Sequence, residues 1–511
     1  MATTTADRHT DRHAGWDGRD SFGRLVLAEW TKLRSVPRWA MAMLAAVVLT
    51  VLVSVLAASG NTYGGGGPGY AVGPDGSGVR DQFYFVHQPL TGDGGVTAKV
   101  LSQAGMEGQR HEWAKAGVII KESTKPGSQY AAMMITPGHG VRLQSNFTTD
   151  RAGSQATTAP RWLRLTRSGT SVIGYESADG ANWTQVGTVE LPSLPRRVEV
   201  GLFVASPFTI RVERQFGSGS VGVLPTSSTA RFSDVVVTAA QPGRPAPWSD
   251  QAIGGSDRVP ASLLGSATQA GGVFTVTGSG DIAPLAGGPV EIDGVRESLT
   301  GVFVGVMVII AVAVLFITSE YRQGMIRTTF AASPRRARVL AAKAIVVGAT
   351  TFVVGLVASV ASVLLALPIL RANGLAPPVF QVPSLSDGPV LRAIAGTAAV
   401  LALLAVLGLA AGAILRRSPG AITVVVVLLL IPQLIAGALP LAAARWLMLV
   451  TPAAGFSIQQ TTVQRYNFVS SICLPEDGCF TTGPWVGFGV LCAYTAVALA
   501  AGFWLLRRRD A

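Results

Sequence analysis

Long apolar segments alternate with polar stretches along this chain, and several are long enough to cross a lipid bilayer as a helix. About 20 apolar residues span the hydrocarbon core of a membrane when they are helical. We therefore predict six transmembrane helices, at residues 39–58, 299–318, 344–368, 393–415, 421–442 and 485–506. This pattern assigns residues 39–58 and 298–511 to an all-α membrane bundle.

The first apolar segment, residues 39–58, has a cleaved signal peptide as its competing interpretation. Such a peptide has an apolar stretch of about 7–15 residues that ends at a cleavage site of small residues. The segment here is longer than that, and it follows a basic amphipathic stretch. We therefore expect it to be retained as the first span.

The stretch before the first span divides into a polar part and an amphipathic part. Residues 1–21 are polar and mixed in charge, so we expect a disordered cytoplasmic tail. Residues 22–38 predict a helix in the membrane interface, with Trp30 at the depth of the lipid headgroups. The alternative is a plain N-terminal extension of the first span. The apolar positions at helical spacing are Phe22, Leu25, Val26, Trp30 and Leu33.

Short runs of alternating apolar and polar positions replace the long apolar segments in the middle of the chain. Turn signals such as Asp179-Gly180 separate these runs. Many short strands with regular turns are typical of an all-β sandwich or barrel. The expected boundaries are 59–80 for a Gly-rich linker, 81–239 for the sandwich and 240–297 for a Gly/Pro-rich return segment with one closing strand at 273–276.

Composition supports a membrane protein. Charged residues make up 14% of the 511 residues and hydrophobic residues 49%, whereas a soluble domain carries about 25% charged residues. The net charge of +12 raises the question of a nucleic-acid partner. The basic residues cluster at the ends of the apolar segments, where membrane topology accounts for them. We therefore expect the lipid bilayer as a partner and no nucleic acid.

Arginines gather in the short loops on one side of the predicted spans. They lie between the second and third spans, between the fourth and fifth, and after the sixth, whereas the opposite loops carry fewer. Because Lys and Arg mark the cytoplasmic side of a membrane protein, we predict cytoplasmic N- and C-termini and an extracellular β-domain. The predicted location is the plasma membrane, with multiple spans.

The cysteines agree with this topology. Cys473 and Cys479 fall in the predicted external loop before the last span, where an oxidising environment favours a disulfide. Two free thiols are the alternative. Cys492 falls inside the last span, and we expect it to pack as a small apolar side chain.

The spans carry almost no acidic, basic or His residues of the kind that relay protons or ions in ion-driven transporters. Glu320 and Lys343 lie at span ends, where long side chains reach the interface. No Lys follows a Gly anywhere in the chain, so the Gly-Lys of a phosphate-binding loop is missing. The chain itself is thus predicted to be no enzyme and to hold no cofactor. Energy for any transport would therefore come from outside the bilayer, and an ATPase, if one is needed, must be another polypeptide.

The stretch at 319–343, between the second and third spans, has features of a rigid connection. Gly324 permits a sharp change of direction after Glu320. Ser333-Pro334 has the form of an N-cap followed by Pro at the first helical position. The functional hypothesis is a stiff cytoplasmic elbow that passes motion from a partner into the spans. The alternative is an ordinary loop that is basic for topological reasons.

The elbow resembles the signature of type 2 ABC-transporter permeases. That likeness rests on the motif Glu320-Tyr321-x-x-Gly324-x-x-Arg327-Thr328 and the segment 332–336, followed by Lys343. The segment 27–35 is similar to the stretch that precedes the first span in that family. Met325 departs from the pattern, because the family usually has Thr there.

The resemblance implies a bacterial export-type permease that works as a homodimer or pairs with a second permease. A separate ABC ATPase would bind at its cytoplasmic side. The residues that the resemblance assigns to ATPase coupling are Glu29, Trp30, Lys32, Glu320, Tyr321, Gly324, Arg327, Thr328, Pro334, Arg335, Arg336 and Lys343.

The β-domain resembles concanavalin-A-like jelly-roll sandwiches of the lectin and glucanase type. The segments that carry this likeness are 113–118, 137–141, 162–165 and 177–183. It implies contact with a cell-envelope glycan, with Trp113, Trp162 and Trp183 as sugar platforms. The alternative is that these Trp side chains fill the core of the sandwich.

A carboxylate pair or a metal site would point to other functions. Glu112 and Glu122 are candidates for the two carboxylates of a glycosidase, although nothing in the sequence places them face to face. The His residues lack metal-ligand spacing, so no metal is expected.

Three hypotheses follow from these patterns. The first is the permease subunit of an ABC exporter, with the β-domain as an extracellular lid or recognition module. The second is a membrane-anchored glycan-binding or sensing protein that transports nothing. The third is a membrane-bound glycosidase.

Overall fold

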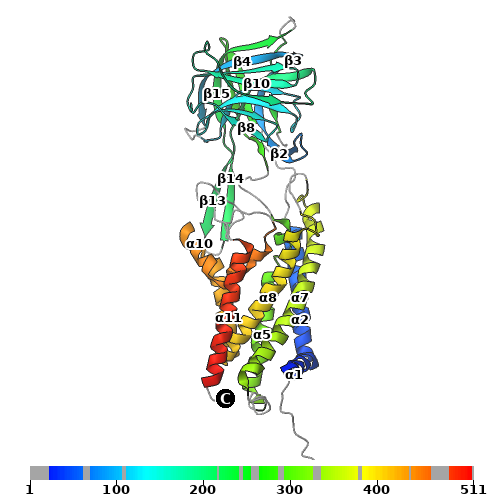
Figure 1. Cartoon of the computed structure of the whole chain (residues 1–511). Coiled ribbons are helices and arrows are strands. Elements are labelled where there is room, and N and C mark those ends of the chain that lie inside the picture. Colours follow the sequence, from blue (N-terminus) through cyan, green and yellow to red (C-terminus); the bar gives the residue numbers. More distant parts are fainter. Residues whose placement is uncertain are drawn as a thin grey trace, which may run out of the picture.

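The computed structural model divides the chain into a helical bundle and a β-domain at one end of it (Figure 1). The predicted tail at 1–21 and Cys473 and Cys479 fall outside the described residues, so the disulfide stays a prediction. The structure describes residues 22–60, 70–105, 111–215, 218–240, 246–254, 264–285, 293–325, 328, 335–377, 383–436, 439–461 and 483–508.

Six described helices are long and apolar enough to cross a membrane, which confirms the predicted number of spans. The two at the centre of the bundle are α5 and α8, whose most apolar windows are each 61% buried, against 22% in α2 and α11. The outer helices thus present much of their apolar surface to the surroundings of the bundle. The six are α2 (Pro37–Gly60), α5 (Val302–Arg322), α7 (Arg336–Ala372), α8 (Gly388–Leu415), α9 (Ser418–Ala436) and α11 (Pro484–Arg508).

The fifth span is shorter than predicted. Helix α9 ends at Ala436, and a separate helix α10 (Leu441–Val450) follows Pro440. A proline lacks the N–H that a helix interior needs, so it separates the two helices. The 3₁₀ helix η2 (Pro452–Gln459) comes next, and all of its residues are buried. It packs chiefly on α11 and also on α8.

The amphipathic N-terminal stretch forms a helix of its own. Helix α1 (Phe22–Ser35) ends before Val36, and Pro37 opens α2. A proline at the first position of a helix has no N–H to leave unpaired there. The interpretation of residues 22–38 as a plain extension of the first span is therefore wrong. Leu33 and Trp39 are buried and anchor the corner between the two helices.

The β-domain is a sandwich of two seven-stranded antiparallel sheets. Inward-facing aliphatic side chains such as Val96, Val118 and Leu165 fill the space between them. One sheet, named the β4 sheet, runs in the order β11 (Thr184–Glu190), β10 (Ser171–Ser177), β9 (Arg161–Ser168), β4 (Gly94–Gly105), β15 (Ser228–Ala239), β18 (Val273–Gly278) and β17 (Gly265–Ala270). The other, the β5 sheet, runs β16 (Ser249–Ile253), β3 (Phe83–Thr91), β12 (Arg197–Ala205), β5 (Lys115–Lys121), β6 (Tyr130–Thr136), β7 (Gly140–Ser145) and β8 (Thr149–Ala152).

The return segment at 240–297 contains more structure than the single closing strand that we expected. Strands β16, β17 and β18 complete the two sheets, and the short helix α4 (Gly294–Glu297) leads into the bundle. Strand β17 is Gly265-Ser-Ala-Thr-Gln-Ala270, which offers no alternation of large apolar residues. Such an edge strand is specified by its pairing with β18 rather than by its own sequence.

A third, small sheet joins the β-domain to the chain that enters and leaves it. It consists of β1 (Tyr70–Val72), β2 (Gly78–Asp81) and β19 (Ile282–Pro284), so part of the expected linker at 59–80 is strand. Two ion pairs fix it to β5. Lys121 Nζ lies 2.7 Å from Asp81 Oδ2, and Lys115 Nζ lies 2.7 Å from Asp281 Oδ1. A further hairpin, β13 (Thr209–Gln215) with β14 (Ser218–Leu224), lies between the sandwich and the helices in Figure 1.

Candidate functional site

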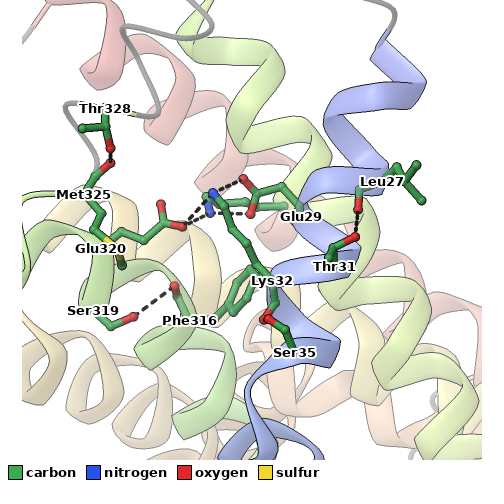
Figure 2. A network of polar contacts seen from close by, with 11 residues as sticks. Leu27, Glu29, Thr31, Lys32, Ser35, Phe316, Ser319, Glu320, Met325 and Thr328 are labelled. Atoms are coloured by element: carbon green, nitrogen blue, oxygen red, sulfur yellow. Dashed lines mark hydrogen bonds and ion pairs between the residues drawn. The ribbon is translucent and has the colours of Figure 1, made fainter.

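Four charged side chains from three helices meet at the end of the bundle that lies farthest from the β-domain. Lys343 Nζ of α7 lies 2.6 Å from Glu29 Oε2 of α1 and 2.6 Å from Glu320 Oε1 of α5. Lys32 Nζ, also of α1, lies 2.8 Å from Glu29 Oε1 and 3.3 Å from Glu320 Oε1. Figure 2 shows Glu29 and Lys32 facing Glu320 across the gap between the helices. We call these four residues the charge cluster.

The charge cluster is largely shielded from solvent. The side chains of Glu29, Glu320 and Lys343 are 0%, 6% and 1% exposed. Two anions alternate with two cations, so the four charges of the cluster cancel. The Lys343 ammonium also lies 4.9 Å from the centre of the Phe316 ring, within reach of a cation–π contact. Because removal of one partner leaves the opposite charge buried and unpaired, the cluster holds α1, α5 and α7 in one arrangement.

Lys32 is the member of the charge cluster that reaches water, with 42% of its side chain exposed. Burial acts to lower its pKa, but the hydrogen bond and charge of Glu29 and the charge of Glu320 outweigh burial. The pKa of Lys32 is therefore raised above its ordinary value of 10.5, and the ammonium stays charged at neutral pH.

Glu320 and Lys343 correct an expectation. We expected both side chains to reach the interface from the span ends, yet both are buried in the charge cluster. The pairing could not be seen in the sequence, because Glu320 is 288 residues from Lys32 and Lys343 is 314 residues from Glu29. Phe316 was missed for the same reason, because an aromatic residue in an apolar span gives no signal of its own.

Exposed residues neighbour the charge cluster along the chain. Trp30 on α1 is 42% exposed and Met325 after α5 is 46% exposed. Gly324 has φ +71°, a conformation that side-chain-bearing residues rarely adopt, and it turns the chain away from α5. The Thr328 hydroxyl donates to the Met325 carbonyl at 2.8 Å. We call the exposed surface of Trp30, Met325 and the neighbouring Arg322 and Arg335 the rim.

The elbow continues into α7. Arg335 occupies the N-cap position without a side-chain hydrogen bond to the helix, and α7 begins at Arg336. Arg336 Nη1 donates to the Leu506 carbonyl at 3.2 Å, which ties the start of α7 to the end of α11. The predicted cap at Ser333-Pro334, and with it Arg327, lies outside the described residues.

Tyr321 brings a fourth helix boundary to this region. The Arg416 guanidinium, at the C-cap of α8, lies 5.3 Å from the centre of the Tyr321 ring. Thr318 and Ser418 are joined by a hydrogen bond of 2.7 Å between their hydroxyls, which links α5 to α9. Neither contact could be predicted from the sequence, since both depend on helix packing.

The C-terminal part of the chain, which holds all of the spans but the first, matches a known family. Residues 266–511 match the family model described as ABC-2 family transporter protein. We call residues 266–511 the ABC-2 region; it is slightly less than half of the chain. The match supports a membrane permease of an ABC transporter, and the apolar helices make the chain a multi-pass membrane protein. Pairing with an ABC ATPase subunit is what this family implies.

The charge cluster crosses the boundary of the ABC-2 region. Glu320 and Lys343 lie inside it, whereas Glu29 and Lys32 lie on α1, far outside it in sequence. Helix α2 also packs on α5 and α7. Residues 22–60 therefore belong to the same helical bundle as the ABC-2 region.

Several solved structures are similar to part of the chain. A functionally unknown protein from Saccharomyces cerevisiae is 22% identical, with 32% of this chain and 78% of that chain covered and a TM-score of 0.20. A member of the eqolisin family of peptidases (10% identical, TM-score 0.23) and scytalido-glutamic peptidase (9%, 0.24) each cover 39% of this chain and 98% of their own. TM-scores of this size carry no assignment of fold or activity. No curated protein matches the chain.

The three Trp residues proposed as sugar platforms are all half-buried, and none belongs to the apolar core between the sheets. Trp113 stacks on His139 with ring centres 3.7 Å apart. The Arg164 guanidinium lies 3.7 Å from the Trp183 ring centre, and the Lys99 ammonium lies 5.6 Å from that of Trp162. The interpretation of these side chains as core is therefore wrong, and their role in glycan contact stays a prediction.

Glu112 and Glu122 do not form a carboxylate pair. They flank the seven-residue strand β5 at its two ends. A strand rises about 3.3 Å per residue, so this strand separates them by more than about 20 Å. Glycosidase carboxylates lie about 5–10 Å apart, which removes these two residues as a hydrolytic pair.

Proposed function

We propose that this chain is the membrane-spanning permease subunit of an ABC exporter, and that a separate ATPase supplies the energy. The observation that supports this most directly is the charge cluster. It joins α1, α5 and α7 at one end of the bundle, beside an exposed rim. No ion relay crosses the described spans, so a force applied from outside the bilayer is the simplest source of motion.

The charge cluster and the rim have different roles in this proposal. The ATPase contacts the exposed rim around Trp30 and Met325. The buried cluster makes α1, α5 and α7 move as one body, because sliding any of the three would separate buried charges. Motion of the ATPase thereby reaches the centre of the bundle, where α5 contacts α8.

Two permease copies, or this chain and a second permease, form the translocation path. The outer helices support this arrangement, since α2, α9 and α11 are only 22–28% buried in their most apolar windows. Lipid covers the faces that the second subunit leaves open. The path lies between the two subunits.

The end of the bundle that carries α1 faces the cytoplasm, and the β-domain faces the exterior. The arginines beside the elbow support this orientation by the positive-inside rule. The β-domain lies at the opposite end of the helices from α1 (Figure 1). From there it acts as a lid or recognition module for what the spans release.

Copurification tests the proposal. The tagged full chain, purified from its own membranes, should carry an ATPase subunit that hydrolyses ATP. The double substitution Trp30→Ala with Met325→Asp should lower the recovered ATPase about tenfold or more, because it removes the apolar part of the rim. Leu385→Asp is the matched control, since Leu385 is also 43% exposed but lies in the loop between α7 and α8, at the other end of α7.

Recovery of the chain without any ATPase would favour the alternative, a membrane-anchored glycan-binding or sensing protein. Equal recovery of the ATPase with the rim variant and with the control would refute the rim as the contact surface.

A further inference from the structure

Two exposed tryptophans mark the depth of the membrane along α11. Trp485 and Trp504 are 65% and 52% exposed and lie near opposite ends of this helix. At about 1.5 Å per residue they are separated by about 28 Å, close to the roughly 30 Å of the hydrocarbon core. Tryptophan favours the headgroup level of a bilayer. The end of α11 that follows Trp504 therefore lies at the headgroup level of the leaflet farther from the β-domain (Figure 1).

Two arginines and a tyrosine converge at this level. Arg336 Nη1 donates to the Leu506 carbonyl, which places Arg336 at the depth of the end of α11. The Arg416 guanidinium lies 5.3 Å from the centre of the Tyr321 ring. The charges of both arginines act on Tyr321, so the three residues share one region. We call Arg336, Arg416 and Tyr321 the arginine site.

The backbone of Arg416 adopts a conformation that does not favour arginine. Its φ is +55°, in the left-handed region, at the C-cap of α8. Glycine is the usual residue where a helix ends in this conformation, because it has no Cβ to clash with the backbone. Strain of this kind gathers at functional sites. The chain thus keeps an arginine where glycine would fold more easily, which indicates that the side chain is used.

Two donors of the arginine site have no acceptor among the described residues. Arg416 Nε and the Tyr321 hydroxyl are both shielded from solvent and make no hydrogen bond there. Buried polar groups in folded proteins are normally paired. The described acidic residues at this end of the bundle are Glu29 and Glu320, and both bind lysines of the charge cluster. An acceptor from outside the chain, with negative charge, therefore suits the site.

Apolar side chains extend from the arginine site toward the middle of the membrane. Leu415, next to Arg416, is 42% exposed. Helix α9 follows directly, and its exposed residues Val424, Val427 and Ile431 recur at helical spacing on one face. A cationic site at headgroup level above an apolar helix face matches the two parts of a phospholipid. A free phosphate ion would use only the first of them.

We propose that the arginine site binds the phosphate of an anionic phospholipid, whose acyl chains lie along α9. A guanidinium can donate two parallel hydrogen bonds to phosphate oxygens, and the Tyr321 hydroxyl supplies a further donor. The second positive charge, from Arg336, favours a lipid with net negative charge over a zwitterionic one. The bound lipid joins the ends of α5, α7 and α8.

Lipid titration followed by native mass spectrometry tests the site on the purified, delipidated full chain. The probes are dioleoyl phosphatidylglycerol, dioleoyl phosphatidylcholine with the same acyl chains, and inorganic phosphate. The wild type should retain phosphatidylglycerol with the higher affinity. Arg416→Gly should weaken that affinity about tenfold or more, while the melting temperature without added lipid stays the same or rises, because glycine suits the backbone. Tyr321→Phe, which keeps every charge, should weaken it about threefold or more.

Arg338→Gln is the matched control. Arg338 is exposed, has the same charge and lies two positions beyond Arg336, about 200° around α7. Its affinity for phosphatidylglycerol should stay within about twofold of the wild type. Equal weakening by Arg338→Gln would show general attraction to a basic surface and overturn the proposal, as would equal affinity for the two lipids.

Two other occupants would be revealed by the same variants. Displacement of the lipid by millimolar inorganic phosphate would overturn the proposal and assign the site to the free ion. Unchanged lipid affinity in Arg416→Gly, with loss of a copurified ATPase, would also overturn it and assign the site to that protein. The lipid titrations need neither an ATPase nor transport, so their failure is separate from failure of the permease function.

Discussion

Replacing Lys343 by Met should destabilise the bundle more than any other single change in the charge cluster. The substitution keeps the length of the side chain and removes the cation that lies 2.6 Å from both Glu29 and Glu320. Breaking a buried ion pair by removal of one partner costs about 3–5 kcal/mol. Lys32 still reaches both carboxylates, at 2.8 and 3.3 Å, so we expect a loss of about 3 kcal/mol, at the lower end of that range.

A double-mutant cycle with Glu320→Gln isolates the interaction. Either single change leaves the cluster with an uncompensated charge. The double variant is neutral again, because Glu29 and Lys32 remain paired. Its loss of stability should therefore be smaller than the sum of the two single losses, by about 1–3 kcal/mol. Lys32→Met is the control, since that side chain is 42% exposed and an exposed pair contributes about 0–1 kcal/mol.

Hydrogen exchange on the purified full chain gives the free energy of opening for peptides of α5 and α7 apart from those of the β-domain. If the stability loss of the double variant equals the sum of the two single losses within about 0.5 kcal/mol, the charge cluster is not a coupled unit. A large effect of Lys32→Met would equally contradict the burial argument.

Three further predictions concern other parts of the molecule. Gly305→Leu should separate α2 from α5 and lower the stability of the bundle by about 1–3 kcal/mol or more. The reason is that an added Cβ would clash with Thr50 Oγ1. Gly489→Leu is the control, because nothing lies within 4 Å of a Cβ there, and it should leave the melting temperature unchanged. Lys121→Met should destabilise the β-domain by about 3–5 kcal/mol, since Asp81 would stay buried without its cation, and an unchanged thermal transition of that domain would contradict this. Burial and the hydrogen bond to Asp250 raise the pKa of Tyr84 to about 12. The protonated Tyr84 therefore stabilises the folded state, fully so below about pH 10, and this contribution is lost as pH rises toward 12. Tyr84→Phe should abolish that part of the pH dependence, as measured by denaturant titration at several pH values.

The sequence was most informative where length and charge decide the structure. An apolar stretch of about 20 residues is a sufficient signal for a span, so all six spans could be located. The boundary at Pro440 and the buried helix η2 could not, because α10 and η2 are themselves apolar and continue the apolar pattern of the fifth span. Strand β17, which is small and polar, depends on the neighbour with which it pairs.

The candidate site was predictable in part. Motif likeness gathered Glu29, Lys32, Glu320 and Lys343 into one list, but it assigned all of them to contact with a partner. The structure buries three of them against one another instead, and leaves Lys32 and the rim exposed for a partner to touch. Burial is a property of the packed helices, and neither spacing nor charge along the chain reveals it.

The small sheet at the base of the β-domain has a consequence for how the molecule is built. Because β2 and β19 pair with each other, the chain enters and leaves the sandwich at adjacent points. Below them, the Gly301 N–H donates to the Ser54 hydroxyl at 3.0 Å, so α2 and α5 are already in contact without help from the domain above. The sandwich is therefore a detachable module. A short turn in its place would let the remaining helices assemble unchanged, and the same two strands would accept a different domain.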